Sequence, residues 1–313
     1  AQPDAVGWGT DLRNRRPVST EVAGLTRGDI PKLQLKWAFS YPDALRGRSQ
    51  PATAGGGLYV GSQNGSVFSL DQKSGCVRWI YKTIAEVRTG IVVQPWTDST
   101  GTDRPMLFFG DLIGHVHAVD AVTGELVWKH RPSYHPSLTL TAAPVLWKGR
   151  LYVPLSALEV TAAADSSYAC CTFKGGVAAY DASSGELIWT GYPITEPQRV
   201  VGKNSVGTDR IAPSGSPVWG TPTVDENRGL MYVGTGENYS SPADGSSDAI
   251  IALSLNDGHM VWTQQMTKDD AWNMACEGED QANCPPEDGP DYDFGAATIL
   301  LTTTSGKDVL LAG

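Results

Sequence analysis

The sequence of 313 residues lacks any apolar run of the roughly 18 residues that a membrane-spanning helix requires. It is also short of positive charge, with 24 Lys and Arg against 34 Asp and Glu, which gives a formal net charge of −10. An acidic surface repels a phosphate backbone. We therefore expect neither a transmembrane segment nor a nucleic-acid partner, and a partner with a basic face is the more natural expectation.

Cysteine and histidine are scarce, at five residues each, and neither type is spaced as zinc ligands are. The sequence has no Cys-x-x-Cys pair, and hence no Cys-x-x-Cys-His haem-attachment motif. The cysteines favour an exported protein with disulfides, which places it in the periplasm or outside the cell. Cys276 and Cys284 lie eight residues apart in a loop and are predicted to form one disulfide.

An internal repeat is the strongest feature of the sequence. Its template is small-x-Asp-x-x-[Ser/Thr]-Gly-x-x-x-Trp, and the fourth copy is degraded because Ser254 replaces the Asp. The interval between the template Trp residues of successive copies lengthens from 49 to 61 to 73 residues. The four copies are Ser69–Trp79, Ala118–Trp128, Ala179–Trp189 and Ala252–Trp262.

Each copy has the composition of a strand, a tight turn and a second strand. Alternating apolar residues predict the strand, and the Ser/Thr-Gly pair predicts a hairpin turn with Gly at positive φ. The Trp is suited to wedging between neighbouring sheets. Further strands are predicted upstream of each copy, at 58–61, 107–110, 151–153 and 230–234. Four strands for each repeat predict an all-β fold, a β-propeller of four-stranded antiparallel blades.

The chain is therefore expected to be one propeller domain over residues 1–313, with about five blades. The blade repeats lie near 58–79, 107–128, 151–189 and 230–262, and a partial blade lies at 294–313. A plain blade needs about 40–50 residues, so the later blades must carry inserted loops, at 154–173, 190–217 and 264–294. Because the last blade stops before its turn and Trp strand, we expect the domain to continue beyond Gly313.

The repeat resembles the tryptophan-docking repeat of the quinoprotein alcohol dehydrogenases, which are eight-bladed propellers that bind pyrroloquinoline quinone (PQQ). Several strings resemble the polyvinyl alcohol dehydrogenases more closely. They are AGLTRGDIPKLQLKWAF at 23–39, ACCTFK at 169–174, GTGENYS at 234–240 and GPDYDFG at 289–295. The resemblance implies an eight-bladed propeller when complete, with PQQ and calcium as cofactors.

The resemblance also assigns residues to the PQQ site. Ser156-Ala157-Leu158-Glu159 matches a family string in which the Ser and its neighbour contact PQQ and the Glu binds calcium. Thr141, fifteen residues before Ser156, matches a Thr that touches PQQ. Trp219, eighteen residues before Glu237, matches the Trp on which the quinone stacks. Arg88 matches an Arg that reaches a PQQ carboxylate.

The second calcium ligand and the general base follow from two further strings. In the family the ligand follows Gly-Thr-Gly and is usually an amide or a short acid; here Glu237 and Asn238 follow, so both remain candidates. Calcium prefers oxygen ligands, which either residue can supply. Tyr292-Asp293-Phe294 matches the aromatic-Asp-aromatic string, so Asp293 is expected to be the base. Most other acidic residues of this loop, Asp270 and Asp291 among them, are interpreted as solvated charges.

Two departures from the methanol-oxidising members of the family concern the cysteines and a basic residue. The adjacent pair Cys170-Cys171 lies in the insertion after Glu159, as in the polyvinyl alcohol group, and not just before Arg88. The two cysteines could pair with each other, or either could pair with Cys76. A basic residue expected near the quinone oxygens would fall beyond Gly313.

The resemblance implies oxidation of an alcohol, with secondary hydroxyls of polyvinyl alcohol as one candidate substrate and a cytochrome c as electron acceptor. A different class remains open, because propellers with this repeat also serve as non-catalytic scaffolds of outer-membrane assembly that bind peptides or proteins. A third reading is a quinoprotein-like binder without activity, since Glu237 departs from the usual ligand. A scaffold has no need of Glu159, Trp219 and Asp293 together.

Overall fold

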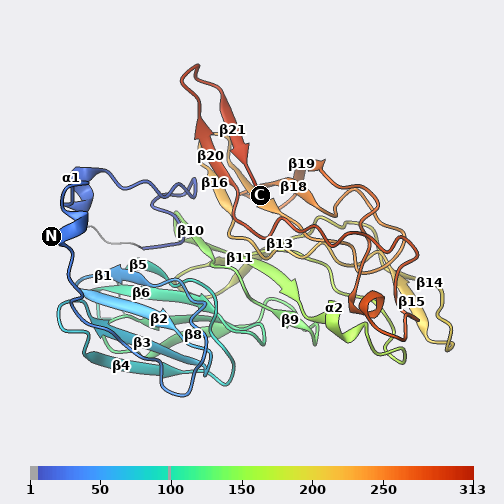
Figure 1. Ribbon diagram of the computed structural model, residues 1–313, viewed down its shortest axis with the longest axis horizontal. Coiled ribbons are helices and arrows are strands. Elements are labelled where there is room, and N and C mark those ends of the chain that lie inside the picture. The colour runs from blue at the N-terminus through green and yellow to red at the C-terminus, as the bar shows by residue number, and fades with distance from the viewer. Residues whose placement is uncertain (1–5, 98–99) are drawn as a thin grey trace.

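The computed structural model describes residues 6–97 and 100–313. Four antiparallel sheets follow one another along the chain, and in each the four main strands are paired in sequence order (Figure 1). The first sheet contains β1 (Ala52–Ala54), β2 (Gly57–Gly61), β3 (Ser66–Asp71) and β4 (Val77–Lys82). The second contains β5 (Val92–Thr97), β6 (Asp103–Gly110), β7 (Val116–Asp120) and β8 (Leu126–His130).

The remaining sheets continue the same pattern. The third contains β10 (Val145–Trp147), β11 (Arg150–Ala157), β12 (Gly176–Asp181) and β13 (Leu187–Gly191), and a short strand β9 (Leu138–Thr139) also pairs with β11. The fourth contains β16 (Thr223–Asp225), β17 (Leu230–Gly234), β18 (Ala249–Ser254) and β19 (Met260–Gln265). A final hairpin consists of β20 (Ile299–Thr302) and β21 (Asp308–Leu311).

These sheets confirm the predicted blades and the four upstream strands. The predicted partial blade is the β20–β21 hairpin, but its first strand begins at Ile299 and not at Phe294. Phe294 is irregular because it packs on the fourth sheet: its amide donates to Thr235 O at 3.2 Å, and its Cβ lies where a side chain on Gly234 would stand.

The core lies mostly between neighbouring sheets, where apolar side chains of one blade meet those of the next. One cluster joins Tyr59 and Val67 of the first sheet to Leu107, Phe109 and Val119 of the second, and all five are at most 3% exposed. Two similar clusters join the second sheet to the third and the third to the fourth. Face-to-face burial of this kind is typical of propeller blades.

The repeat Trp of each of the first three blades docks on the turn of the following blade, whereas Trp262 of the fourth sheet is 38% exposed. Trp79 of β4 packs on Gly124, and its indole nitrogen donates to Ala121 O at 3.0 Å. Trp128 of β8 packs on Gly185 in the same way and donates to Ala182 O at 2.9 Å. Both turn glycines have positive φ, at 77° and 74°. A side chain at either glycine would overlap the indole, which explains the Gly and the Trp of the template together.

An unpredicted docking Trp precedes the first blade. Trp37 packs on the turn glycine Gly75 and donates to Gln72 O at 3.1 Å. The segment before it contains the helix α1 (Thr20–Ala23) and the 3-10 helix η1 (Ile30–Lys32). Trp37 therefore packs on the turn of the first blade in the same way as Trp79 of β4 packs on the turn of the second blade.

The three predicted insertions are present beside the third and fourth sheets, but each begins later than expected, because β11, β13 and β19 extend to Ala157, Gly191 and Gln265. The first contains α2 (Glu159–Ala162), the second contains the hairpin β14 (Arg199–Lys203) and β15 (Asp209–Ala212), and the third contains the 3-10 helix η2 (Met274–Glu277). In Figure 1 these elements lie together at one end of the molecule. Among the described residues, no helix has the length and apolar character needed to cross a membrane.

Candidate active site

Three of the predicted cofactor-binding residues, Arg88, Thr141 and Trp219, line one cavity of about 260 Å³. Each lies four residues before the first strand of its blade, because those strands, β5, β10 and β16, begin at Val92, Val145 and Thr223. They therefore occupy the same structural position in successive blades. The cavity is further lined by Trp8, Arg48, Gly90, Ala142, Ala143, Gly220, Thr221, Gly295 and Ala297.

Two glycines make room for the aromatic walls of this cavity. A Cβ on Gly295 would collide with the six-membered ring of Trp219, so only glycine permits the indole to lie there. A Cβ on Gly90 would come within 3.0 Å of Ala143 Cβ and 3.8 Å of the Trp8 ring. Trp8 itself is held by Arg16, whose guanidinium lies 4.4 Å from the ring centroid.

The predicted pair Thr141 and Ser156 is brought together although fifteen residues separate them. Their hydroxyl oxygens lie 3.2 Å apart, and the Ser156 hydroxyl donates to Thr139 O at 3.1 Å. Ser156 and Ala157 end the long strand β11, and both are buried. The Ala157 carbonyl accepts a hydrogen bond from the Tyr239 hydroxyl at 3.4 Å.

A cluster of three carboxylates lies close to Trp219. Oxygens of Glu237, Asp291 and Asp293 lie within 4.8 Å of one another. The Glu237 amide donates to Asp293 Oδ1 at 3.2 Å. Gly236 is required here as well, because a Cβ at that position would collide with the Asp293 carboxylate.

Burial raises the pKa of all three carboxyls, and the charge of Asp293 adds to this effect on Glu237 and Asp291. Burial is the largest effect on Glu237, which is 3% exposed, and the charge of Asp293 raises its pKa further. Burial raises the pKa of Asp293 despite hydrogen bonding from Glu237, whose amide donates to it. Burial, followed by the charges of Asp293 and Asp270, raises the pKa of Asp291 to about 6. A cation among these oxygens would remove the repulsion, so the cluster fits a hard metal ion.

The structure distinguishes Glu237 from Asn238. The Asn238 side chain is 1% exposed and fully used within the protein: its Nδ2 donates to Ser214 O and Ser216 Oγ, and its Oδ1 accepts from the Asp244 amide at 2.7 Å. Only Glu237 of the two belongs to the carboxylate cluster.

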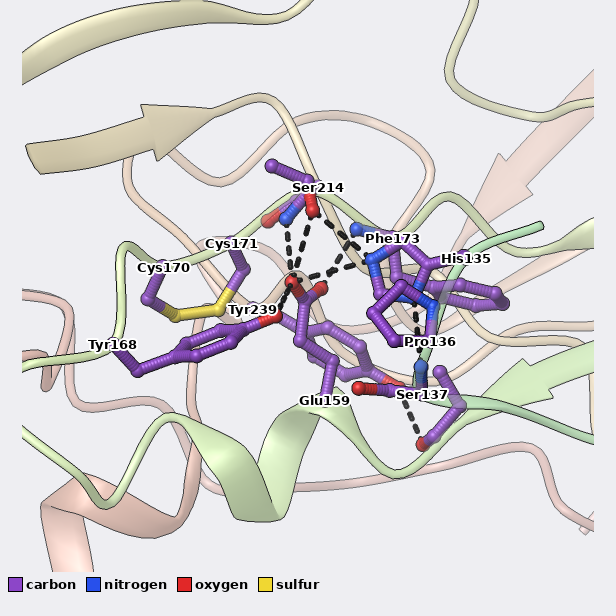
Figure 2. A network of polar contacts seen from close by, with 12 residues as sticks. His135, Pro136, Ser137, Glu159, Tyr168, Cys170, Cys171, Phe173, Ser214 and Tyr239 are labelled. Carbon is purple, nitrogen blue, oxygen red and sulfur yellow. Dashed lines mark hydrogen bonds and ion pairs between the residues drawn. A yellow bond between two sulfur atoms is a disulfide. The ribbon is translucent and has the colours of Figure 1, made fainter. Parts of the chain in front are cut away.

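Glu159 lies in a different network, which Figure 2 shows. Its carboxylate accepts hydrogen bonds from the Tyr168 hydroxyl at 2.8 Å and from the amides of Thr172 and Phe173 at 2.8 and 2.7 Å. His135 Nε2 lies 3.5 Å away. Although burial opposes ionisation, these hydrogen bonds lower the Glu159 pKa. Within the described residues, the structure does not bring Glu159 into the cluster of Glu237, Asp291 and Asp293.

The adjacent cysteines in the same insertion form a disulfide with each other, which resolves their pairing (Figure 2). Cys170 and Cys171 are both buried, at 3% and 0% exposed. The predicted Cys276–Cys284 disulfide is confirmed, and Cys76 is free and exposed.

Comparison with known proteins gives the family. The PQQ family of glucose, ethanol and alcohol dehydrogenase β-propeller domains matches residues 19–279. The chain belongs to this family. It is 36% identical over 309 residues to a polyvinylalcohol dehydrogenase of Sphingopyxis sp. (strain 113P3), covering 98% of this chain and 46% of that protein. It is 34% identical over 308 residues to a polyvinylalcohol dehydrogenase of Pseudomonas sp., covering 98% and 47%.

Solved structures of this PQQ family share the propeller fold. The chain superposes on the quinohemoprotein alcohol dehydrogenase of Comamonas testosteroni with a TM-score of 0.69 at 21% identity, covering 99% of this chain and 45% of that one. A europium-containing methanol dehydrogenase gives a TM-score of 0.67 at 23% identity, covering 99% and 54%. The chain spans about half the length of the relatives it matches.

Sequence reasoning missed or misassigned several residues of this site. Asp270 was expected to be solvated, but it is fully buried and accepts a hydrogen bond from the Tyr292 amide at 3.1 Å. Asp291 is exposed, as expected. The acidic composition of the loop did not indicate that an oxygen of Asp291 lies within 4.8 Å of oxygens of Glu237 and Asp293. Arg48 could have been found from the repeat, because it stands four residues before β1, as Arg88 stands before β5.

Proposed function

We propose that the protein containing this chain oxidises an alcohol with PQQ and calcium and passes the electrons to a cytochrome c. The observation that carries the proposal is the convergence of Arg88, Thr141 and Trp219, from three successive blades, on one cavity. Asp293 precedes Gly295, which lines the cavity, by two residues, and an oxygen of Glu237 lies within 4.8 Å of an oxygen of Asp293. Both carboxylates are therefore close to the cavity.

The residues of this cavity fit a flat anionic aromatic molecule. Trp219 offers an indole face for stacking, Arg88 a guanidinium for a carboxylate, and Thr141 a hydroxyl that Ser156 holds at 3.2 Å. The end of β11, with Ser156 and Ala157, would contribute the remaining contacts. When bound, PQQ supplies the carbonyl that accepts a hydride.

Glu237 and Asp291 are the calcium ligands that we propose, because their oxygens already lie within 4.8 Å of each other and of Asp293. A cation held by Glu237 and Asp291 would keep these carboxylates ionised and would supply Lewis acidity at the site. Glu159, predicted as a ligand from the family string, would first have to give up the amides of Thr172 and Phe173. We propose instead that it fixes the insertion after β11.

Asp293 is the general base of the proposal. Its Oδ1 is oriented by the Glu237 amide, and the Trp219 indole lies close to it. From this position the carboxylate would take the hydroxyl proton of an alcohol as the hydride leaves the carbon. The polyvinylalcohol dehydrogenases among the relatives support a secondary alcohol as substrate.

Partner and location follow from charge and disulfides. A net charge of −10 would attract a basic electron acceptor such as a cytochrome c. The two disulfides, Cys170–Cys171 and Cys276–Cys284, support the periplasm or the extracellular space.

Reconstitution of the full-length protein tests the function. The purified protein would be incubated with PQQ and calcium, and reduction of an artificial dye would be followed with a small secondary alcohol and with polyvinyl alcohol. We expect alcohol-dependent reduction that requires both additions. Failure to take up PQQ would exclude the proposal and favour the peptide-binding scaffold, while uptake without any alcohol oxidation would indicate a binder without activity.

A further inference from the structure

Five blades contribute the same structural position to the cavity lined by Trp219. The residue four positions before the first strand is Arg48 for β1, Arg88 for β5, Thr141 for β10, Trp219 for β16 and Gly295 for β20. All five line the cavity. Arg48 is therefore the first-blade counterpart of Arg88, and the repeat itself places a second guanidinium there.

The charges around these two arginines are not balanced within the chain. Arg88 is half-buried, and among the described residues neither Arg48 nor Arg88 has a carboxylate within salt-bridge distance. Burial is the largest influence on Arg88 and lowers its pKa, and the charge of Arg48 is the next. The nearby Glu86 lies 3.8 Å from Arg46, which does not line the cavity. The charge of Glu86 offsets part of this effect on the Arg88 pKa, but Glu86 makes no salt bridge with either Arg48 or Arg88, so the two guanidiniums still favour an anion between them.

We propose that Arg48 and Arg88 together bind two carboxylates of one ligand, so that the cavity selects a flat aromatic ring carrying more than one carboxylate. This inference rests on the proposed function, in which that ligand is PQQ. Guanidinium groups suit the role because each presents a planar set of donors that matches a carboxylate. Trp219 and Trp8 supply the aromatic surfaces of the same cavity.

The shape of the cavity supports a planar ligand. Gly90 and Gly295 keep side chains out of the space beside the two indoles. The Arg16 guanidinium lies 4.4 Å from the centroid of the Trp8 ring, and the Trp8 carbonyl accepts a hydrogen bond from Gln50 Nε2 at 2.9 Å. Because Gln50 lies two residues after Arg48, the segment that carries the arginine is tied to the segment that carries Trp8.

The test is the dissociation constant of PQQ, measured with the full-length protein by quenching of tryptophan fluorescence. Arg48→Gln is the test variant, and Arg46→Gln is the matched control, since it removes the same charge two residues away. PQQ trimethyl ester serves as the second probe, because it keeps the rings and loses the carboxylates. Circular dichroism and the urea midpoint would show that each variant is folded.

We expect Arg48→Gln to weaken PQQ binding by about 10-fold to 100-fold, the loss typical of a charge-assisted hydrogen bond. Arg46→Gln should change it less than about threefold, and the trimethyl ester should bind the wild type and Arg48→Gln equally. Arg48→Lys, which keeps the charge without the planar donors, should lie between.

Equal PQQ affinity in Arg48→Gln and wild type would overturn the inference while leaving the proposed function intact. An equal loss in Arg46→Gln and Arg48→Gln would also overturn it, since a general charge effect would then explain both. If the wild type binds no PQQ, the proposed function itself fails.

Discussion

Substitution of a turn glycine that packs against a repeat Trp should destabilise the propeller far more than substitution of a turn glycine whose added Cβ would meet no other atom within 4 Å. Gly185 has φ 74°, and a Cβ there would lie 2.6 Å from Trp128 Cδ2 and 2.7 Å from His130 Cδ2. Trp128 cannot withdraw easily, because it is 7% exposed and bonded to Ala182 O. The left-handed backbone costs an alanine about 1–2 kcal/mol, and overpacking adds about 1–3 kcal/mol.

Gly185→Ala should therefore lower the free energy of unfolding by about 2–5 kcal/mol. Gly149→Ala is the matched control, since Gly149 has φ 76° and a Cβ there would meet nothing within 4 Å. It should lose only about 1–2 kcal/mol. The assay is urea unfolding of the full-length protein, followed by tryptophan fluorescence and circular dichroism. Equal losses in the two variants would refute the docking account.

Three further predictions concern charge, disulfide and metal. Burial opposes ionisation of Asp111, but hydrogen bonds from His117 and nearby groups lower its pKa. The ionised carboxylate therefore stabilises the fold at neutral pH, and this stabilisation is lost as the pH falls below about 4. Asp111→Asn should lower the free energy of unfolding by about 1–3 kcal/mol at pH 7 and make it less dependent on pH in the acid range. Cys276→Ser should lower the free energy of unfolding by about 2–3 kcal/mol through loss of loop closure, whereas Cys76→Ser, at a free and exposed thiol, should leave it unchanged. Glu237→Gln should weaken calcium binding to the PQQ-loaded protein at least about tenfold in a calorimetric titration, and unchanged affinity would exclude Glu237 as a ligand.

Most of the fold could be predicted from the sequence because the residues of the repeat determine its local structure and its packing. A Gly at positive φ and a Trp four residues later fix the turn, the strand pair and the contact with the next blade at once. The docking role of Trp37 was not predicted, because this Trp occurs without the rest of the template and its partner Gly75 is distant in sequence. The start of β20 was misplaced because Phe294 is apolar but bonded to the neighbouring sheet.

The site was less predictable from the sequence, since it depends on the conformations of the inserted loops. Spacing within the family strings led to Arg88, Thr141 and Trp219, which do line one cavity. Spacing could not show that the amides of residues 172–173 occupy the Glu159 carboxylate, or that Asp291 turns toward Asp293. Both outcomes are decided by inserted loops whose sequence has no repeat to follow.

The most direct test of the account is a single-turnover reduction of bound PQQ by an alcohol, comparing the full-length wild type with Asp293→Asn. Both proteins should bind PQQ stoichiometrically, because Asp293 is not among the residues that line the cofactor cavity. The account predicts that the variant reduces bound PQQ about 100-fold to 10,000-fold more slowly, the range expected for loss of a general base. An unchanged rate in Asp293→Asn would contradict it.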